Sequence, residues 1–501
     1  MSCLLLSNFV FKSHHLFQVT RQYSSFFARH SDIPTSTIVK TGQTVSRLGF
    51  GGYRINRHNP HHKEALISAI KQGINVIDTA TTFEGGESEK LIGLAVKEAE
   101  SLGICRWSDL VVITKAGYIH PTQWGSPNSK AIHNHCIHPD FIQNEITESL
   151  RRLQTDRIDI FMLNNPERML LNPNKTYSMN RLYNEIVETC TYLDEECAKG
   201  RIGGYGICSN LMALPSSNDN ISFPSILSKL SPQSRQNFVA IETPFNIFER
   251  EAIWNDGGEK TLAELAELNE VFLFTNRPFH TIAGGTIRTL VTSSGEVEPE
   301  QVFAKLERNF EKLSQLETEL NEQFPVETSL QSKFVWAQVL SENLSRLSKN
   351  HFATKHYLEK DIKPAIERDL AALADYASVE VFDEEKIRLK TWIDDYRTEA
   401  KDLIYNIIDY ARIDLLLKNQ DLDAVLSLIC PSLISETDHF HSPLSAKALR
   451  IILANSRVGC ALVGMRRVEY VNDAVTVLKL SIDDEMTVER LDDIYQCPAL
   501  Q

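Results

Sequence analysis

The sequence predicts an α/β fold, a (β/α)8 TIM barrel with a long helical insertion between the seventh strand and the helix that follows it. Short apolar runs alternate with amphipathic helical stretches, which is typical of parallel strands joined by helical crossovers. An open doubly wound sheet would give the same alternation, but no G-x-G-x-x-G motif follows any run, which weakens that interpretation. Residues 275–442 break the rhythm, because they are far longer than an ordinary barrel crossover.

Eight apolar runs are predicted to be barrel strands because they are short and separated by helical stretches. They are residues 45–50, 74–77, 110–114, 158–163, 202–207, 238–241, 271–274 and 460–463. Helices are predicted at residues 88–102, 140–153, 182–198 and 443–453. Eight strands of this kind are enough to close a barrel.

The predicted insertion covers residues 280–442 and reads as nearly all helix. Apolar residues first recur at spacings of three and four, at Val302, Leu306, Phe310, Leu313, Leu316 and Leu320. Two further apolar sets, at 387–396 and 403–417, favour a helical hairpin or small bundle. Because the insertion follows a strand, we expect it at the C-terminal face of the barrel, where barrel enzymes keep their active sites.

Composition limits the class of protein. The chain has 501 residues, a formal net charge of −14 and a hydrophobic fraction of 42%, which is ordinary for a globular protein. The acidic balance argues against binding to nucleic acid, and no apolar stretch is long enough to predict a membrane span. Nine scattered cysteines without a C-x-x-C pair indicate free thiols in a reducing compartment.

Residues 1–31 are predicted to be a mitochondrial transit segment. They contain no acidic residue, and Lys12, Arg21 and Arg29 are interspersed with apolar, Ser and His residues, as in transit peptides. Residues 21–24, Arg-Gln-Tyr-Ser, also resemble a matrix-processing site. The apolar run at 4–10 leaves a secretory signal as a rival interpretation, and a tail without a targeting role is a third. Residues 479–501 are interpreted as a C-terminal tail.

Six segments, in order along the chain and each at or near a predicted strand, resemble the aldo-keto reductase family. The first begins with Asp-Thr-Ala at residue 78 and continues to Ser-Glu-Lys-Leu-Ile-Gly at 88–93. The full set is residues 78–93, 113–117, 149–166, 200–210, 242–246 and 463–472. The resemblance covers about residues 37–279 and 443–478, so it implies a reductase barrel with the insertion outside it.

The resemblance implies a catalytic tetrad, two of whose members are replaced. In this family a Tyr hydroxyl protonates the carbonyl oxygen during hydride transfer, a Lys and its Asp partner lower the Tyr pKa, and a His orients the carbonyl. Asp78 and Lys115 stand at the Asp and Lys positions. Phe83 stands at the Tyr position and has no proton to give, and Asn164 stands at the His position, where it can donate a hydrogen bond but does not titrate.

The resemblance also implies an NADP site. The residues at its cofactor positions are Ser209, Asn210, Glu242, Arg277, Gly464, Arg466 and Asn472. Ser209 and Asn210 match residues that hold the nicotinamide carboxamide, and Glu242 replaces a Gln that grips the same amide. Arg277 stands where the diphosphate loop lies. Arg466 favours NADP over NAD, because it stands where the adenosine 2′-phosphate is contacted.

The sequence leaves two classes of function open. The first is an aldo-keto reductase-like NADP-dependent oxidoreductase that acts on a small carbonyl or alcohol in mitochondria. The second is a catalytically silent NADP-binding pseudo-reductase, which acts through a protein partner on its insertion. Phe83 and Asn164 admit three readings, namely a silent site, a substitute donor such as a loop His, a loop Tyr or a water, or a shifted register.

Each of these assignments also has a purely structural interpretation. Lys115 and Asp78 would also make a buried structural ion pair, and Arg466 a solvated helix start. The dense set His133, His135, Cys136 and His138 would suit zinc or copper, or replace the missing acid, but a polar loop explains it equally. No metal site is therefore assigned.

Overall fold

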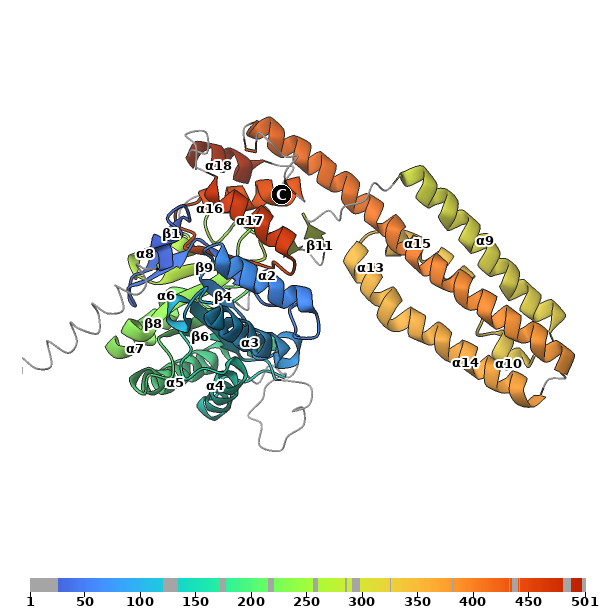
Figure 1. Ribbon diagram of the computed structural model, residues 1–501, viewed down its shortest axis with the longest axis horizontal. Helices are drawn as coiled ribbons and strands as arrows, with labels where there is room; N and C mark the ends of the chain where they lie inside the picture. The colour runs from blue at the N-terminus through green and yellow to red at the C-terminus, as the bar shows by residue number, and fades with distance from the viewer. Residues whose placement is uncertain are drawn as a thin grey trace, which may run out of the picture. The chain divides into compact units, whose positions relative to one another are not determined.

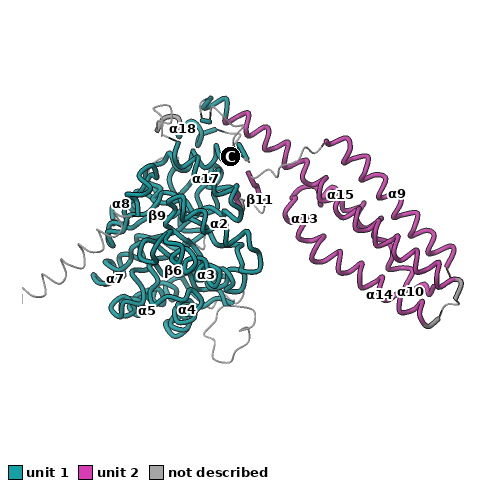
Figure 2. The backbone as a smooth tube through the Cα atoms, viewed as in Figure 1, with its two compact units in different colours: residues 1–279, 427–501 teal, residues 280–426 magenta. Residues whose placement is uncertain are grey.

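The computed structural model describes residues 26–497 apart from residues 120–133, 172–176, 215–219, 256–259, 284–285, 291–297, 325, 381–382, 432, 435–439, 441 and 481–487. The chain divides into two compact units (Figure 2). Unit 1 comprises residues 1–279 and 427–501, and unit 2 comprises residues 280–426. No helix in the described part of the chain is long and apolar enough to cross a membrane.

Unit 1 is a closed barrel of eight parallel strands (Figure 1). In chain order the strands are β3 (Leu48–Gly51), β4 (Val76–Asp78), β5 (Val111–Ala116), β6 (Ile160–Asn164), β7 (Tyr205–Cys208), β8 (Phe238–Pro244), β9 (Phe272–Asn276) and β12 (Cys460–Val463). Each strand pairs with its sequence neighbour, and β12 closes the ring between β9 and β3. The predicted (β/α)8 barrel is confirmed, and the insertion follows β9, its seventh strand.

Helices cover the outside of the barrel. They are α2 (Pro60–Lys71), α3 (Glu87–Ser101), α4 (Pro139–Leu153), α5 (Met179–Ala198), α6 (Phe223–Lys229), α7 (Pro232–Asn237), α8 (Leu262–Leu268), α16 (Pro443–Ala454), α17 (Val468–Lys479) and α18 (Val488–Gln496). Helix α4 shows why they form: Pro139 stands at its first position, the His138 side chain accepts a hydrogen bond from Asp140 N, and Ile142 and Ile146 are buried on one face.

The strands are almost completely buried, because helices lie outside them and side chains fill the interior. Glycine is required at one close approach between strands. A Cβ atom at Gly206 in β7 would collide with the backbone carbonyl of Ala240 in β8. The barrel can therefore close at this point only around a residue without a side chain.

The first predicted strand, 45–50, is wrong in detail, because two strands share it. Residues Gln43–Ser46 form β2, which pairs antiparallel with β1 (Thr35–Ile38), and β3 begins at Leu48. Ser46 marks the break: its N–H donates to Asn75 Oδ1 at 2.8 Å and its hydroxyl donates to Leu48 O at 2.7 Å. These hydrogen bonds of the Ser46 and Asn75 side chains take the place of strand-to-strand backbone hydrogen bonds, so the chain can change direction between β2 and β3.

Five other predicted strands begin one to three residues too early, and two of them share a cause. The sequence places strand starts at Ile158 and Ile202, but β6 begins at Ile160 and β7 at Tyr205. Ile158 and Ile202 pair with each other in an isolated bridge, which explains why both carry strand-like apolar side chains. Gly203 and Gly204 lie between that bridge and β7 and interrupt the strand.

Unit 2 is mainly helical, with one strand hairpin that the sequence did not predict. The hairpin joins β10 (His280–Ala283) to β11 (Thr286–Thr289). The helices are α9 (Pro299–Gln323), α10 (Thr328–Gln331), α11 (Trp336–Glu342), α12 (Leu344–Leu347), α13 (His351–Tyr357), a π-helical turn (Leu358–Ile362), α14 (Lys363–Glu380) and α15 (Asp383–Ile429). The end of α15 extends past residue 426 into unit 1.

Unit 2 has its own hydrophobic core. Leu313 and Leu320 of α9 are fully buried against residues of α14 and α15, as the spacing of apolar residues predicts. Trp392 stacks on Tyr396 with ring centroids 4.9 Å apart. The buried Glu317 carboxylate accepts a hydrogen bond from the Tyr396 hydroxyl at 2.8 Å and from Ala337 N at 3.0 Å. These apolar contacts and hydrogen bonds thus all join residues of unit 2 to one another.

The chain is packed against the barrel from Phe26 onward. Phe26 is fully buried, and the Arg29 guanidinium donates to Ile104 O at 3.2 Å and lies over the Phe26 ring. Lys479 pairs with Asp32 at 2.7 Å, which ties the start of the described chain to the end of α17. Residues 1–25, most of the predicted transit segment, lie outside the described residues.

Candidate active site

Three charged side chains meet inside the barrel. Asp78 is the last residue of β4, Lys115 lies in β5, and Glu242 lies in β8, on the other side of the ring. Lys115 Nζ donates to Asp78 Oδ1 and lies 3.0 Å from Glu242 Oε2. The exposed fractions are only 5% for Asp78 and 2% for both Lys115 and Glu242. The structure thus brings together two predicted catalytic residues and one predicted cofactor residue.

Burial sets the electrostatics of this cluster. Desolvation raises the pKa of Asp78 to about 7, against the opposing pull of the Lys115 ammonium and with a further rise from Glu242. Desolvation works against the charged form of Lys115, but Asp78 and Glu242 outweigh it and raise the Lys115 pKa. Lys115 therefore stays positively charged, and Asp78 is poised to bind or release a proton near neutral pH.

Phe83 lies over the cluster. It begins a short 3-10 turn, Phe83–Gly86, directly before α3. Lys115 Nζ lies 5.7 Å from the centre of the Phe83 ring, and the Tyr53 ring meets the same ring edge-on at 5.0 Å. The Phe83 side chain thus faces the ammonium across a distance suited to a cation–π contact, but it carries no proton for a substrate.

Asn164 is oriented by a neighbouring amide. It is the last residue of β6, and its Oδ1 accepts a hydrogen bond from Asn165 Nδ2 at 3.3 Å. The same Asn165 Nδ2 donates to the Tyr118 hydroxyl at 3.0 Å. Within the described residues no acceptor is found for Asn164 Nδ2 or for the Tyr118 O–H. Both groups are therefore free to donate to a ligand.

His135 supports this arrangement from behind. It is fully buried, and its Nε2–H donates to the Asn164 carbonyl at 2.7 Å, which leaves Nδ1 buried without a hydrogen-bond partner. Burial lowers the His135 pKa to about 4, so the ring is neutral. His138 caps α4, Cys136 is buried, and His133 lies outside the described residues. No cluster of three metal-ligating side chains is found in the described chain.

Ser209 and Asn210 surround a buried carboxyl that sequence reasoning missed. Glu167 Oε1 accepts hydrogen bonds from Ser209 Oγ at 2.8 Å and from Asn210 N at 3.2 Å. Burial raises the pKa of Glu167 to about 7, and those hydrogen bonds lower it only in part. Ser209 N also donates to Glu242 O at 2.9 Å, which places this group directly beside the ion cluster. The motif Asn-Asn-Pro-Glu-Arg, which begins at the last residue of β6, was the available signal.

The residues predicted to contact the cofactor phosphates and adenine differ in whether they already have a partner within the protein. Arg277 has a positive φ of 56°, and its guanidinium pairs with Glu249 at 3.2 Å. Gly464 and Arg466 are exposed between β12 and α17, and no ion pair of Arg466 is found in the described chain. Asn472 is exposed on α17, and its Oδ1 accepts from Gln72 Nε2 at 2.9 Å. Arg466 is thus free for an anion, while Arg277 and Asn472 would exchange partners.

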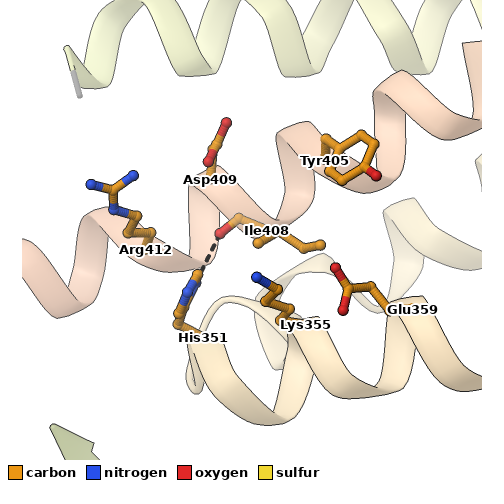
Figure 3. Close-up of a pocket in the computed structure, with 7 residues that line it drawn as sticks. All are labelled: His351, Lys355, Glu359, Tyr405, Ile408, Asp409 and Arg412. Atoms are coloured by element: carbon orange, nitrogen blue, oxygen red, sulfur yellow. Dashed lines mark hydrogen bonds between the residues drawn. The ribbon is translucent and has the colours of Figure 1, made fainter. Parts of the chain in front are cut away.

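A separate pocket lies entirely within unit 2 (Figure 3). His351 of α13 donates from Nδ1 to Ile408 O of α15 at 3.1 Å across it. The remaining lining residues are Lys355, Glu359, Tyr405, Asp409 and Arg412. Opposite charges balance along its wall, so it has no net attraction for an ion of either sign.

Comparison with known proteins agrees with the barrel geometry. The model of the aldo/keto reductase family matches residues 47–352. Aldo-keto reductase YhdN of Bacillus subtilis is 26% identical over 222 residues, or 43% of this chain and 55% of the relative. The NADH-specific methylglyoxal reductase of Escherichia coli is 27% identical over 185 residues, or 35% of this chain and 50% of the relative. The chain spans about half the length of the curated relatives it matches.

The chain is also similar to solved structures, at low sequence identity. An aldo/keto reductase from Klebsiella pneumoniae in complex with NADP and acetate is 13% identical, covers 92% of this chain and 96% of its own, and gives a TM-score of 0.42. Fold and family model together define the class, an α/β barrel of oxidoreductase type. The chain belongs to the aldo/keto reductase family.

Proposed function

We propose that this protein is an NADP-dependent oxidoreductase that interconverts a small carbonyl compound and the corresponding alcohol in mitochondria. The observation that carries the proposal is the buried cluster of Asp78, Lys115 and Glu242 at the C-terminal ends of the barrel strands. Active sites of barrel enzymes lie at these strand ends. Relatives named for methylglyoxal and 6-dehydroglucose support a small carbonyl as the substrate class.

The described residues fit the proposed cofactor. Ser209 and Glu242 lie side by side, since Ser209 N donates to Glu242 O at 2.9 Å, and the Glu242 carboxylate offers the oxygen acceptors that a carboxamide NH₂ requires. Arg466 is exposed and free to pair with a phosphate, and α17 begins two residues later. When bound, the cofactor supplies or accepts the hydride. The protein supplies the binding groups and the proton chemistry around it.

The groups that polarise the carbonyl belong to this chain. Lys115 stays charged, donates a hydrogen bond to Asp78 and forms an ion pair with Glu242. The Asn164 amide has its NH₂ group free, in the role the family gives to His. Phe83 gives no proton, so we assign the proton donor to Tyr118, whose hydroxyl is held by Asn165 and has no described acceptor. Burial raises the pKa of Tyr118, which keeps the phenol protonated at neutral pH.

Cofactor binding to the purified chain, beginning near residue 24, is the first test. NADPH and NADH are titrated by calorimetry against the wild type, Arg466→Ala, and Arg457→Ala as a control on the exposed barrel surface. We expect micromolar binding of NADPH, weakened at least about tenfold by Arg466→Ala and unchanged by Arg457→Ala. No binding of either nucleotide, or binding without turnover of any small carbonyl or alcohol, would overturn the proposal.

The mitochondrial location has its own test. Residues 1–24 fused to a fluorescent protein should direct it to mitochondria, because this acid-free segment carries the basic residues Lys12 and Arg21, as transit peptides do. Replacing both with Glu should leave the fusion in the cytosol. Secretion of the unaltered fusion, or a diffuse cytosolic signal, would contradict the proposed location.

A further inference from the structure

We propose that this protein binds the oxidised cofactor, NADP⁺, more tightly than NADPH, because the ion cluster beside the nicotinamide position carries an excess negative charge. This inference rests on the proposed function. It extends that function in two ways. It predicts which redox form of the cofactor the protein holds in the absence of substrate, and it predicts the class of substrate that reacts with this complex.

The excess charge follows from the partners of Lys115. One ammonium faces two carboxylates, Asp78 and Glu242, and in the described chain no other Lys, Arg or His lies within ion-pair distance of either acid. The second oxygen of Glu242 accepts from the neutral amide of Asn276 at 2.6 Å. Above about pH 7, where Asp78 has lost its proton, two carboxylates face one ammonium, and the cluster has one negative charge more than its positive charge.

The other described groups beside the cluster do not compensate for that charge. The thiols of Cys208 and Cys460 border it, and burial raises the pKa of both well above the ordinary value, so they stay neutral. Glu167 lies on the far side of Ser209 and contributes either no charge or a second negative one. Because all these groups are buried, salt and water screen their charges poorly.

The two forms of the cofactor differ in the charge of one ring. The oxidised nicotinamide ring carries a positive charge and the reduced ring is neutral, while the rest of the dinucleotide is the same. Glu242 and Ser209 stand at the proposed carboxamide contacts, and Ser209 N bonds Glu242 O at 2.9 Å. A charge acting through protein over several ångströms changes affinity by about tenfold or more, so the cluster favours the oxidised ring.

This preference points to an alcohol as the substrate of the resting complex. Oxidation breaks one C–H and one O–H bond and forms a carbonyl. The hydride reduces the bound NADP⁺ to NADPH, and the proton is released to water. No further oxidant or reductant is needed.

The test compares dissociation constants rather than rates. NADP⁺ and NADPH are each titrated by calorimetry against the wild type, Glu242→Gln, Asp78→Asn and the control Glu267→Gln, which removes an exposed acid from α8. We expect the wild type to bind NADP⁺ more tightly. We expect Glu242→Gln to reduce the ratio of the two affinities about tenfold, Asp78→Asn to move it in the same direction, and Glu267→Gln to leave it unchanged.

Equal binding of both forms by the wild type, or tighter binding of NADPH, would overturn this inference while the proposed function stands. The wild-type ratio decides this even where a variant fails to fold. An unchanged ratio in a folded Glu242→Gln protein would also overturn it. Absence of any nucleotide binding would instead overturn the proposed function, and this inference with it.

Discussion

Lys115 lies between two buried acids, and such a buried ion cluster contributes little to the stability of a barrel. The cost of removing three charges from water offsets most of their mutual attraction, and apolar side chains would fill this layer at least as well. The polar Asn164–Asn165–Tyr118 group beside it likewise leaves two hydrogen-bond donors unused. At the scale of single residues, this pattern is typical of a binding or catalytic site and not of a structural remnant.

Restoring the phenol at position 83 should increase reductase activity. Because Lys115 Nζ lies 5.7 Å from the Phe83 ring centre, Phe83→Tyr brings a hydroxyl into the field of the ammonium, which favours its role as an acid. We expect a rise in kcat for a small aldehyde of up to about 10²-fold, with a further gain from adding Asn164→His. Phe83→Leu is the matched control. A rate that stays at the wild-type level in both variants would mean that the proton comes from elsewhere.

Tyr118 is the proposed proton donor of the wild type, and removing its hydroxyl tests that assignment. Tyr118→Phe removes the one hydroxyl held by Asn165, so we expect kcat to fall about 10²-fold while cofactor affinity is unchanged. Combining Tyr118→Phe with Phe83→Tyr should recover part of the lost rate. Tyr405→Phe, at an exposed tyrosine in unit 2, serves as the control. Full activity of Tyr118→Phe would exclude it as the donor.

Glu167 should make the fold less stable as pH rises. Its pKa is raised from 4.5 to about 7, so the folded protein holds this proton more tightly than the unfolded chain. The resulting stabilisation is complete below pH 4.5 and is lost as pH rises through about 7. Glu167→Gln cannot titrate, and its melting temperature should fall less between pH 5 and pH 8 than that of the wild type. Parallel pH curves for the two proteins would contradict this assignment.

Only those residues of the candidate site that lie in a local sequence motif could be predicted. Asp78 and Lys115 each follow from a motif on their own strand, and the structure places them in contact. The pair between Lys115 and Glu242 could not be predicted, because it joins β5 to β8 across the barrel and depends on side-chain length. Glu167 was missed because burial, which gives it its properties, is not visible in the sequence.

At the scale of elements, the predicted strands identify the barrel, while their ends depend on contacts between strands. The last strand, 460–463, has the predicted bounds, but β5, β6, β8 and β9 continue past the predicted ends. Most of the added residues are polar, as at Lys115 and Asn164, and a hydrophobicity pattern stops before them. The strand ends that carry the chemistry are thus the parts that apolar periodicity predicts least well.

The segment from Phe26 to Ser31 offers a prediction at this scale. Removal of residues 1–24 should leave thermal stability unchanged, because Phe26 keeps its buried position. Removal of residues 1–31 should lower stability by about 3–5 kcal/mol, since it deletes a fully buried aromatic side chain. Phe26→Ala in the shorter truncation should reproduce most of that loss in chemical denaturation. Equal stability of the two truncations would show that residues 26–31 do not contribute to the barrel.

At the scale of the whole molecule, the chain combines two units with separate cores. The helices of unit 2 bury apolar residues from α9 through α15 against one another. The barrel closes through β12 and β9 without any strand from unit 2. The sequence predicts an insertion with helical periodicity of its own at residues 280–442, and unit 2 covers residues 280–426. The hairpin β10–β11 was missed, because four-residue strands are too short to show a pattern.

Two separate cores should unfold in two separable steps, and substitutions in one core should move only its own transition. Leu313 is fully buried on α9, so Leu313→Ala should destabilise unit 2 by about 2–5 kcal/mol through the lost contacts and the cavity left behind. Phe303→Ala removes a larger side chain from the same helix, but Phe303 is 48% exposed, so its effect should stay within about 0.5 kcal/mol. Scanning calorimetry of the full chain, with the isolated fragment 280–426 to assign the transition of unit 2, distinguishes the cases. A single transition that Leu313→Ala shifts as a whole would mean that the two units unfold cooperatively, because their cores would then depend on each other for stability.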